Sequence, residues 1–275
     1  MGRERESGSL DQRAIWGGGV LLLLVMLAMV APWISPAANG QDVVLTRFLA
    51  PFTRDVHGAW HLLGTDRLGR DVWSRVLFGA RISLAVGVLT MLLSLLLGVA
   101  VGASAALSRR GIATVLLGLT DFALGVPRVV LLLLLAALWP PSAVQVVLVL
   151  GATGWMPIAR LVYAETKSQL GRPYVEGATA LGAGSFRVLF RHILPHAAPP
   201  VLAAVTLGIG NAITLEAGLS FLGLGVQPPA ASWGSLIASG RDTVVNAPWV
   251  GLAPGIALVM VVVSCTLIAD GLQER

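Results

Sequence analysis

Long apolar runs alternate with shorter polar segments along most of the chain. The apolar runs cover residues 15–33, 82–107, 112–138, 143–164, 200–222 and 249–269. A helix needs about 20 predominantly apolar residues to cross the hydrocarbon core of a bilayer. The pattern therefore predicts an all-α membrane protein with six transmembrane helices.

The first apolar run has two interpretations. A polar stretch with Arg3, Arg5 and Arg13 precedes a Leu-rich stretch, and this order is also typical of a signal peptide. We favour a retained helix over 15–33, because an even number of spans places the polar segment 165–198 on the same side as the N-terminus.

The Lys and Arg content of the short loops predicts the orientation. Cytoplasmic loops carry an excess of these residues, and two arginines lie in 108–111 whereas none lies in 139–142. We therefore expect a cytoplasmic N-terminus. The predicted order is a cytoplasmic tail (1–14), a first transmembrane helix (15–33), an extracytoplasmic loop (34–81), a transmembrane core (82–269) containing a cytoplasmic loop (165–198), and a cytoplasmic tail (270–275).

Composition agrees with a protein surrounded by a lipid bilayer. Hydrophobic residues make up 56% of the chain and charged residues only 12%, against about 25% charged residues in soluble domains. The net charge of +5 would suit a nucleic-acid partner, but no basic soluble domain with interleaved aromatics supports one. The single cysteine, Cys265, excludes an internal disulfide.

Glycines in the apolar runs predict close helix packing. Gly98 and Gly102 lie four residues apart, as do Gly251 and Gly255. Small residues at this spacing allow membrane helices to approach closely.

The polar segment from Gly171 to Pro200 predicts two short helices. Pro173 suits a first helical turn, and Glu176 lies near the positive end of the helix dipole. Gly177 costs a helix about 1 kcal/mol relative to alanine, which suggests close approach to another surface or, alternatively, an irregular loop.

We expect the second helix to start after Ser185 as N-cap and to end at Pro195. Its apolar positions follow one helix face: Phe186, Leu189, Phe190, Ile193 and Leu194. This face would lie on the membrane domain, while the slim first helix would face the cytosol as a knob for a partner's groove.

This segment resembles the EAA loop of permease subunits in ATP-binding-cassette importers. Glu176-Gly177-Ala178, Gly182 and Leu194-Pro195 have the spacing of that loop, although Gly177 replaces an alanine and His192 stands at an isoleucine position. Two further stretches, Gly64–Leu84 and Glu216–Pro229 followed by Ser232-Trp233-Gly234, resemble the dipeptide/oligopeptide/nickel permease family, in its second-permease type. The resemblance spans about residues 10–272.

The resemblance implies a type I ABC importer permease fold in a bacterial or archaeal inner membrane. It implies four partners, namely a second permease subunit, two cytoplasmic ATPase subunits and an extracytoplasmic substrate-binding protein. By resemblance, the residues that contact the ATPase are Arg172, Tyr174, Glu176, Gly177, Ala178 and Gly182.

The resemblance also implies that ATP and Mg are bound by the partner subunits, so no cofactor and no catalytic residue are expected on this chain. The sequence contains no G-x-x-x-x-G-K-[ST] phosphate loop. Peptides are the expected substrate, with nickel or another metal chelate as the alternative. A stand-alone secondary transporter would need an ion-coupling site or inverted repeats, and neither is evident.

Three charged residues within the apolar runs are candidates for the translocation pathway: Asp121, Arg128 and Glu216. Charges inside a membrane usually face a cavity or a partner helix, so helix packing is the alternative for each, and it is favoured for Glu216. In the loop before residue 82, Asp66, Arg70 and Asp71 could contact the binding protein, but a hydrogen-bonded structural loop is favoured.

Two histidine pairs have the spacing of metal ligands on a helix, His57 with His61 and His192 with His196. Neither pair has an evident third ligand, so we predict no metal site.

Overall fold

Helices form most of the computed structural model, which describes residues 2–35, 45–56 and 58–273. The helices are α1 (Gly2–Ile34), α2 (Val72–Leu107), α3 (Arg110–Gly125), α4 (Arg128–Ala137), α5 (Ala143–Ala152), α6 (Trp155–Leu170), α7 (Pro173–Ala180), α8 (Ser185–Val188), a π-helical turn η1 (Leu189–Ile193), α9 (Leu194–Phe221), α10 (Trp233–Arg241) and α11 (Trp249–Gln273). A small antiparallel hairpin joins β1 (Thr53–Arg54) to β2 (Trp60–His61), with Thr53 opposite His61.

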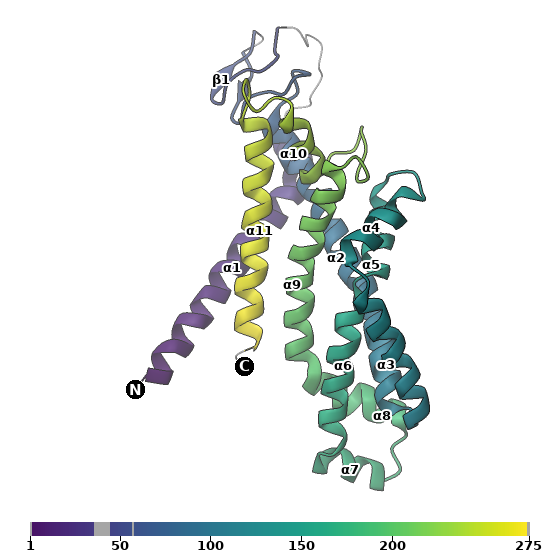
Figure 1. Cartoon of the computed structure of the whole chain (residues 1–275). Helices are drawn as coiled ribbons and strands as arrows, with labels where there is room; N and C mark the ends of the chain where they lie inside the picture. The colour runs from purple at the N-terminus through teal and green to yellow at the C-terminus, as the bar shows by residue number, and fades with distance from the viewer. Residues whose placement is uncertain (1, 36–44, 57, 274–275) are drawn as a thin grey trace.

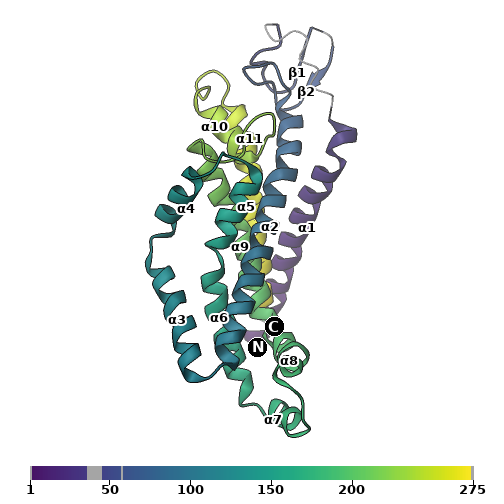
Figure 2. The same ribbon diagram turned by 90° about the vertical axis from the view of Figure 1, so that its right-hand side faces the viewer.

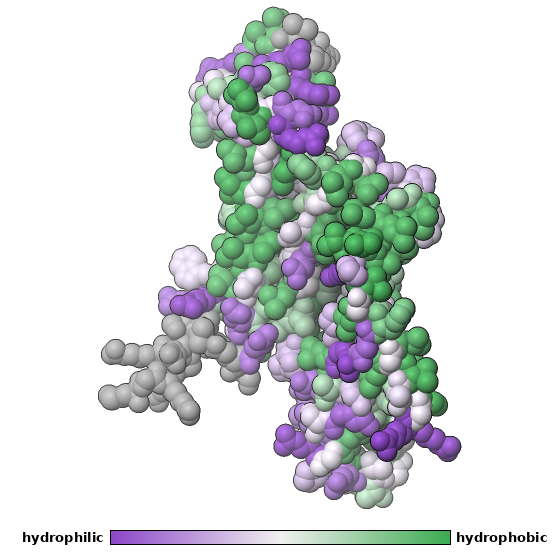
Figure 3. All heavy atoms as spheres, in the orientation of Figure 1, coloured by the Kyte–Doolittle hydropathy of each residue, from purple (hydrophilic) through white to green (hydrophobic). Residues whose placement is uncertain are grey.

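The helices form an elongated bundle with two distinct ends. Both chain termini and α7 lie toward one end, and β1 and β2 lie at the other (Figures 1 and 2); we call these the α7 end and the hairpin end. Apolar side chains cover the middle of the molecule, and polar ones gather toward the ends (Figure 3). This distribution is the one expected for a bundle whose middle lies in hydrocarbon.

Four unbroken helical stretches are long and apolar enough to cross a membrane: 12–34, 72–107, 185–221 and 249–273. Two further spans would each consist of a bent pair, α3 with α4 at 84° and α5 with α6 at 40°. The described residues therefore contain four to six candidate membrane spans.

The apolar runs 112–138 and 143–164 are each divided into two helices. Val126 takes an extended conformation directly before Pro127, because proline disfavours the helical region for the residue that precedes it. The second break lies at Thr153 and Gly154, between α5 and α6. Both breaks lie within the predicted spans.

The helix predicted from residue 82 begins at Val72, so the last part of the predicted loop 34–81 is helical. Asp71 caps this helix, since its Oδ2 accepts hydrogen bonds from the backbone N and the Oγ of Ser74, both at 2.7 Å. His61 Nδ1 lies 2.9 Å from Asp71 Oδ1. Asp66 Oδ2 accepts from Arg70 Nε at 2.8 Å. The favoured interpretation of Asp66, Arg70 and Asp71 as a hydrogen-bonded loop is confirmed.

Three of the four glycines singled out in the apolar runs lie at tight helix contacts. A Cβ on Gly98 would lie 2.7 Å from Cβ of Ile158 in α6, and one on Gly102 would overlap the carbonyl oxygen of Ala159. Gly251 packs against Gly240 of α10, and a Cβ on Gly240 would lie 2.6 Å from the Cα of Gly251. No atom lies within 4 Å of a Cβ on Gly255. Close packing is therefore confirmed for the pair in α2 and for Gly251 alone in α11.

We predict that Gly102→Leu destabilises the protein by about 1–3 kcal/mol or more, because the added side chain must displace the backbone of α6. Gly118→Leu is the matched control, since a Cβ on this α3 glycine meets no atom within 4 Å. The midpoint of thermal unfolding of the purified protein in detergent is the measurement. Equal midpoints for the two variants would contradict the close approach of α2 and α6.

Candidate functional site

Local sequence fixes the start of α7. Arg172 occupies the N-cap position in an extended conformation, and Pro173 is the first helical residue. Proline lacks the N–H that would be unsatisfied there. Glu176 lies in the first turn and is exposed, where its charge stabilises the positive end of the helix.

Gly182 ends α7 through its backbone conformation. Its φ of +85° is a value that residues with a Cβ rarely adopt. The backbone N of Gly182 donates to the carbonyl of Thr179 at 2.9 Å, and the N of Ala183 donates to that of Ala178 at 3.0 Å. These two bonds form a Schellman motif. Gly182 therefore determines the backbone conformation at the end of α7 through contacts within its own chain.

One side chain of α7, Val175, is buried, with 2% of its surface exposed. It packs in a cluster with Ile158 and Val162 of α6, Val188 of α8 and Ile193 of η1. This cluster fixes α7 to the helices that enter the membrane-spanning body.

Tyr174 also contacts its own chain. Its ring stacks on His196 with centroids 4.9 Å apart. Its hydroxyl donates to Gln169 Oε1 at 2.9 Å. Tyr174 therefore joins the last turn of α6, α7 and the start of α9, while about a third of its surface stays exposed.

The rest of α7 forms an outward surface. Arg172, Glu176 and Gly177 are exposed, and Ala178 is half-buried. A Cβ on Gly177 would meet no atom within 4 Å. Contacts within the described part of the chain therefore do not require a glycine at position 177.

The helix after α7 differs from the prediction at both ends. Gly184 is the N-cap and Ser185 the first helical residue, so the expected Ser185 cap is wrong. Pro195 does not end the helix, which continues from Ser185 to Phe221. Five π-helical residues, Leu189–Ile193, end two positions before this proline. A wider turn adjusts the backbone where proline removes a hydrogen bond and crowds the preceding turn.

The predicted apolar face of this helix divides into two sides. Leu189 and Ile193 are buried, whereas Phe186 and Phe190 are 75% and 50% exposed. The two phenyl rings lie 4.4 Å apart. One side therefore packs on the Val175 cluster, and the aromatic pair faces outward.

Asp121, Arg128 and Glu216 have different neighbours and do not form one site. Asp121 Oδ1 pairs with Arg160 Nη2 at 2.5 Å, and both side chains are about half exposed. Arg128 lines a small cavity of about 50 Å³ with Val126 and Thr153, where the two helix breaks meet.

Glu216 is completely buried in a hydrogen-bonded cluster near the hairpin end. Its Oε1 accepts from Ser220 Oγ at 2.6 Å and from Ser232 Oγ at 2.7 Å. Ser83 Oγ lies 3.5 Å from Oε2 and accepts from the backbone N of Trp233 at 3.0 Å. The carboxyl group thus joins α2, α9 and the N-cap of α10.

Several of these contacts were absent from the sequence interpretation. Ser220 lies four residues after Glu216, a spacing at which helix side chains meet, so that bond could have been anticipated. Ser83, Ser232 and Arg160 are distant in sequence from their partners, and no local pattern points to them.

The histidine pairs contact protein groups. His57 lies outside the described residues. His61 Nε2 lies 3.5 Å from Asp55 Oδ2, and His196 Nδ1 donates to the carbonyl of His192 at 2.7 Å. In the described ranges, no group of three or more His, Cys, Asp or Glu residues is placed to hold a metal ion.

We predict that Glu216→Ala destabilises the protein by about 1–3 kcal/mol, because it leaves buried hydroxyl groups without their acceptor. Glu216→Gln keeps one acceptor oxygen and should therefore lose less stability than Glu216→Ala. Asp270→Ala removes an exposed carboxylate from α11 and should leave stability unchanged. Unfolding of the purified protein followed by tryptophan fluorescence tests this order; an equal effect of the two alanine variants would contradict it.

Comparison with known proteins identifies the family. Residues 94–275 match the family described as binding-protein-dependent transport system inner membrane component. A protein of Brucella suis biovar 1 (strain 1330), which carries the provisional name of a peptide transport system permease protein, is 41% identical over 266 residues, covering 96% of this chain and 88% of that protein. The di/tripeptide transport system permease protein DppC of Pseudomonas aeruginosa (strain UCBPP-PA14) is 36% identical over 272 residues, covering 98% and 89%. This chain therefore belongs to the family of binding-protein-dependent transport system inner membrane components.

Proposed function

We propose that this chain is one permease subunit of an ATP-binding-cassette importer for peptides. Its relatives carry the names of peptide permeases, which favours peptides over the nickel-chelate alternative. The observation that carries the proposal is α7, an exposed helix of small residues that is attached to the membrane-spanning body by Val175.

In this proposal, α7 is the docking helix for a cytoplasmic ATPase subunit. Arg172, Glu176, Gly177 and Ala178 form the contact surface, while Tyr174 and Gly182 hold that surface in shape. ATP and Mg are bound by the two ATPase subunits, and a second permease subunit completes the pathway. The extracytoplasmic binding protein delivers the solute at the hairpin end.

Movement received by α7 has a direct mechanical route into the membrane. Val175 packs on Val188 and Ile193, and these residues belong to the helical stretch 185–221 that continues to Glu216 and the hairpin end. Packed helices with two discrete arrangements convert a small displacement at one end into a switch at the other. We infer alternating access on this basis.

We further propose six transmembrane spans with the N-terminus in the cytoplasm. Each bent pair, α3 with α4 and α5 with α6, then counts as one span. An even number agrees with the position of α7 and both termini at the same end of the bundle (Figure 1).

For Asp121 and Arg128 we propose positions on the translocation pathway, because charged groups within membrane spans usually face a water-filled cavity or a partner. Asp121 and its partner Arg160 are both about half exposed. Glu216 would act on the same pathway indirectly. Its buried cluster holds the ends of α2, α9 and α10 together, so it would position these helices without touching the solute.

The proposed function is tested by reconstitution into proteoliposomes with candidate ATPase, second permease and binding-protein subunits. We expect peptide uptake that requires ATP and every one of these partners. Uptake that persists without any ATPase subunit would contradict an ATP-driven importer.

Glu176→Lys should reduce binding-protein-stimulated ATP hydrolysis and peptide uptake at least tenfold, because it reverses an exposed charge on the docking surface. The variant should lose only about 0.3–1 kcal/mol of stability, the usual contribution of an exposed charge at a helix end, since Glu176 makes no ion pair with any described residue. Asp270→Lys is the matched control, an exposed acidic residue at the same end of the bundle. Normal coupling in Glu176→Lys would exclude this surface as the docking site.

Gly177→Ala separates docking from folding. Alanine should stabilise α7 by up to about 1 kcal/mol, because a Cβ fits at this position. If the glycine allows close approach of the ATPase, the same variant should weaken coupling, measured as uptake per ATP hydrolysed. Unchanged coupling would show that the glycine has no docking role.

A further inference from the structure

A cavity of about 1060 Å³ opens along one face of α2 toward the hairpin end. The end of α1, the start of α5 and the loop 229–231 form its other walls. Residues of α2 at positions 75, 78, 82, 86 and 89 line it, which is the spacing of a single helix face. Phe78 and Leu89 on this face are exposed, whereas Val86 is buried against α4 and α5.

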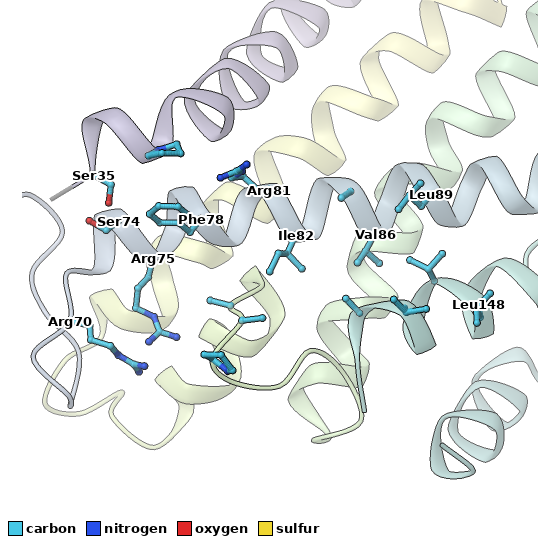
Figure 4. Close-up of a pocket in the computed structure, with 18 residues that line it drawn as sticks. Ser35, Arg70, Ser74, Arg75, Phe78, Arg81, Ile82, Val86, Leu89 and Leu148 are labelled. Atoms are coloured by element: carbon cyan, nitrogen blue, oxygen red, sulfur yellow. The ribbon is translucent and has the colours of Figure 1, made fainter. Parts of the chain in front are cut away.

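The cavity has one part lined by charged side chains and another lined by apolar side chains (Figure 4). Arg70, Arg75 and Arg81 line the part nearest the hairpin end, whereas Ile82, Val86, Leu89 and Leu148 line the part toward the middle of α2. No acidic residue lies among the described residues that line it.

The positive charge at this end is only partly neutralised. Asp66 Oδ2 lies 2.8 Å from Arg70 Nη2 and 3.4 Å from Arg75 Nη1, so one carboxylate serves two guanidinium groups. Arg75 Nε is buried and has no hydrogen-bond acceptor among the described residues. A buried donor without an acceptor is costly, so an acceptor for this group must come from outside the described residues.

Arg81 is exposed and makes no ion pair with any residue that the structure describes. It directly precedes the apolar run of α2, so it lies where the charged end of the cavity meets the apolar part. An unpaired guanidinium facing hydrocarbon is strongly unfavourable, so we expect the partner of Arg81 to be water or an anionic group from outside the described residues. A guanidinium group binds a carboxylate through paired, charge-assisted hydrogen bonds.

The size and the two surfaces of the cavity fit a particular ligand. Binding sites for small molecules typically have volumes of about 300–1000 Å³. An acidic surface of the binding protein could meet the arginines but would not fill the apolar part. A phospholipid could meet both surfaces, and the experiment below distinguishes it from the peptide that the proposed function supplies. A short peptide has both a carboxylate terminus and apolar side chains.

We propose that Arg81 binds the carboxylate terminus of the peptide as it enters the cavity from the hairpin end. The apolar side chains of the peptide then lie against Ile82, Leu89 and Leu148. This inference rests on the proposed function, and it assigns to the permease a selectivity for free carboxylate termini that is separate from the selectivity of the binding protein.

The test uses the complete transporter in proteoliposomes with saturating binding protein. Two forms of one peptide are compared, with a free or an amidated carboxyl terminus, chosen for equal affinity for the isolated binding protein. Arg81→Gln should reduce uptake of the free-acid peptide about tenfold, the usual effect of losing one charge-assisted hydrogen-bonded contact, and should leave uptake of the amide unchanged. Arg81→Lys should show an intermediate loss.

Arg241→Gln is the control at the same end of the molecule. Arg241 is largely exposed, pairs with its neighbour Asp242 at 3.2 Å and does not line the cavity. The transporter with Arg241→Gln should import both peptides at the rate of the unsubstituted protein.

Three results would overturn the inference. If Arg81→Gln reduces uptake of the free-acid and the amidated peptide equally, recognition of the carboxylate is excluded. A loss that appears only in vesicles with anionic lipid would assign Arg81 to a lipid phosphate. A higher half-saturating concentration of binding protein, with an unchanged maximal rate, would assign Arg81 to docking of that protein. If the unsubstituted transporter imports neither peptide, the proposed function itself fails.

Discussion

The continuous helix from Ser185 to Phe221 is the constraint on which the rest of the structure depends. One end packs on Val175 and so holds α7. The other end carries Glu216, whose carboxyl group joins α9 to α2 and α10. A break in this helix would separate the two ends mechanically. The π-helical turn before Pro195 therefore matters, because it allows the helix to continue through a residue that normally ends one.

The helices on the other side of α2 have a different character. α3 with α4 and α5 with α6 are bent at breaks that meet around Arg128 and Thr153. Backbone groups freed by such breaks must find partners inside the protein, and Ser94 Oγ, for example, donates to the carbonyl of Gly151 at 3.1 Å. The chain thus combines a continuous helix attached to α7 with two bent pairs beside it. Together with the cavity along α2, this arrangement suits the proposed role of a subunit that lines a pathway with a second subunit.

The sequence predicted features that depend on local physical chemistry. Apolar length located the candidate membrane spans, and Pro173 located the start of α7. Features that depend on tertiary contacts were not predictable from local patterns. Pro195 indicated a helix end, but packing of Leu189 and Ile193 on the Val175 cluster favours continuation through a π turn. Asp71 and Ser74 form a capping pair that starts α2 before its apolar run, and polarity alone assigned these residues to a loop. The acceptors and donors around Glu216 come from three segments, and only the fold brings them together.

The central claim is that α7 receives the movement of an ATPase subunit. Hydrogen–deuterium exchange of the permease pair, measured with and without bound ATPase subunits, tests it most directly, because backbone amides covered by a partner exchange more slowly. The account predicts that amides of residues 173–183 become protected when the ATPase subunits bind, while amides of the hairpin-end loop 58–71 do not change. Binding of the ATPase subunits without any added protection in α7 would contradict it.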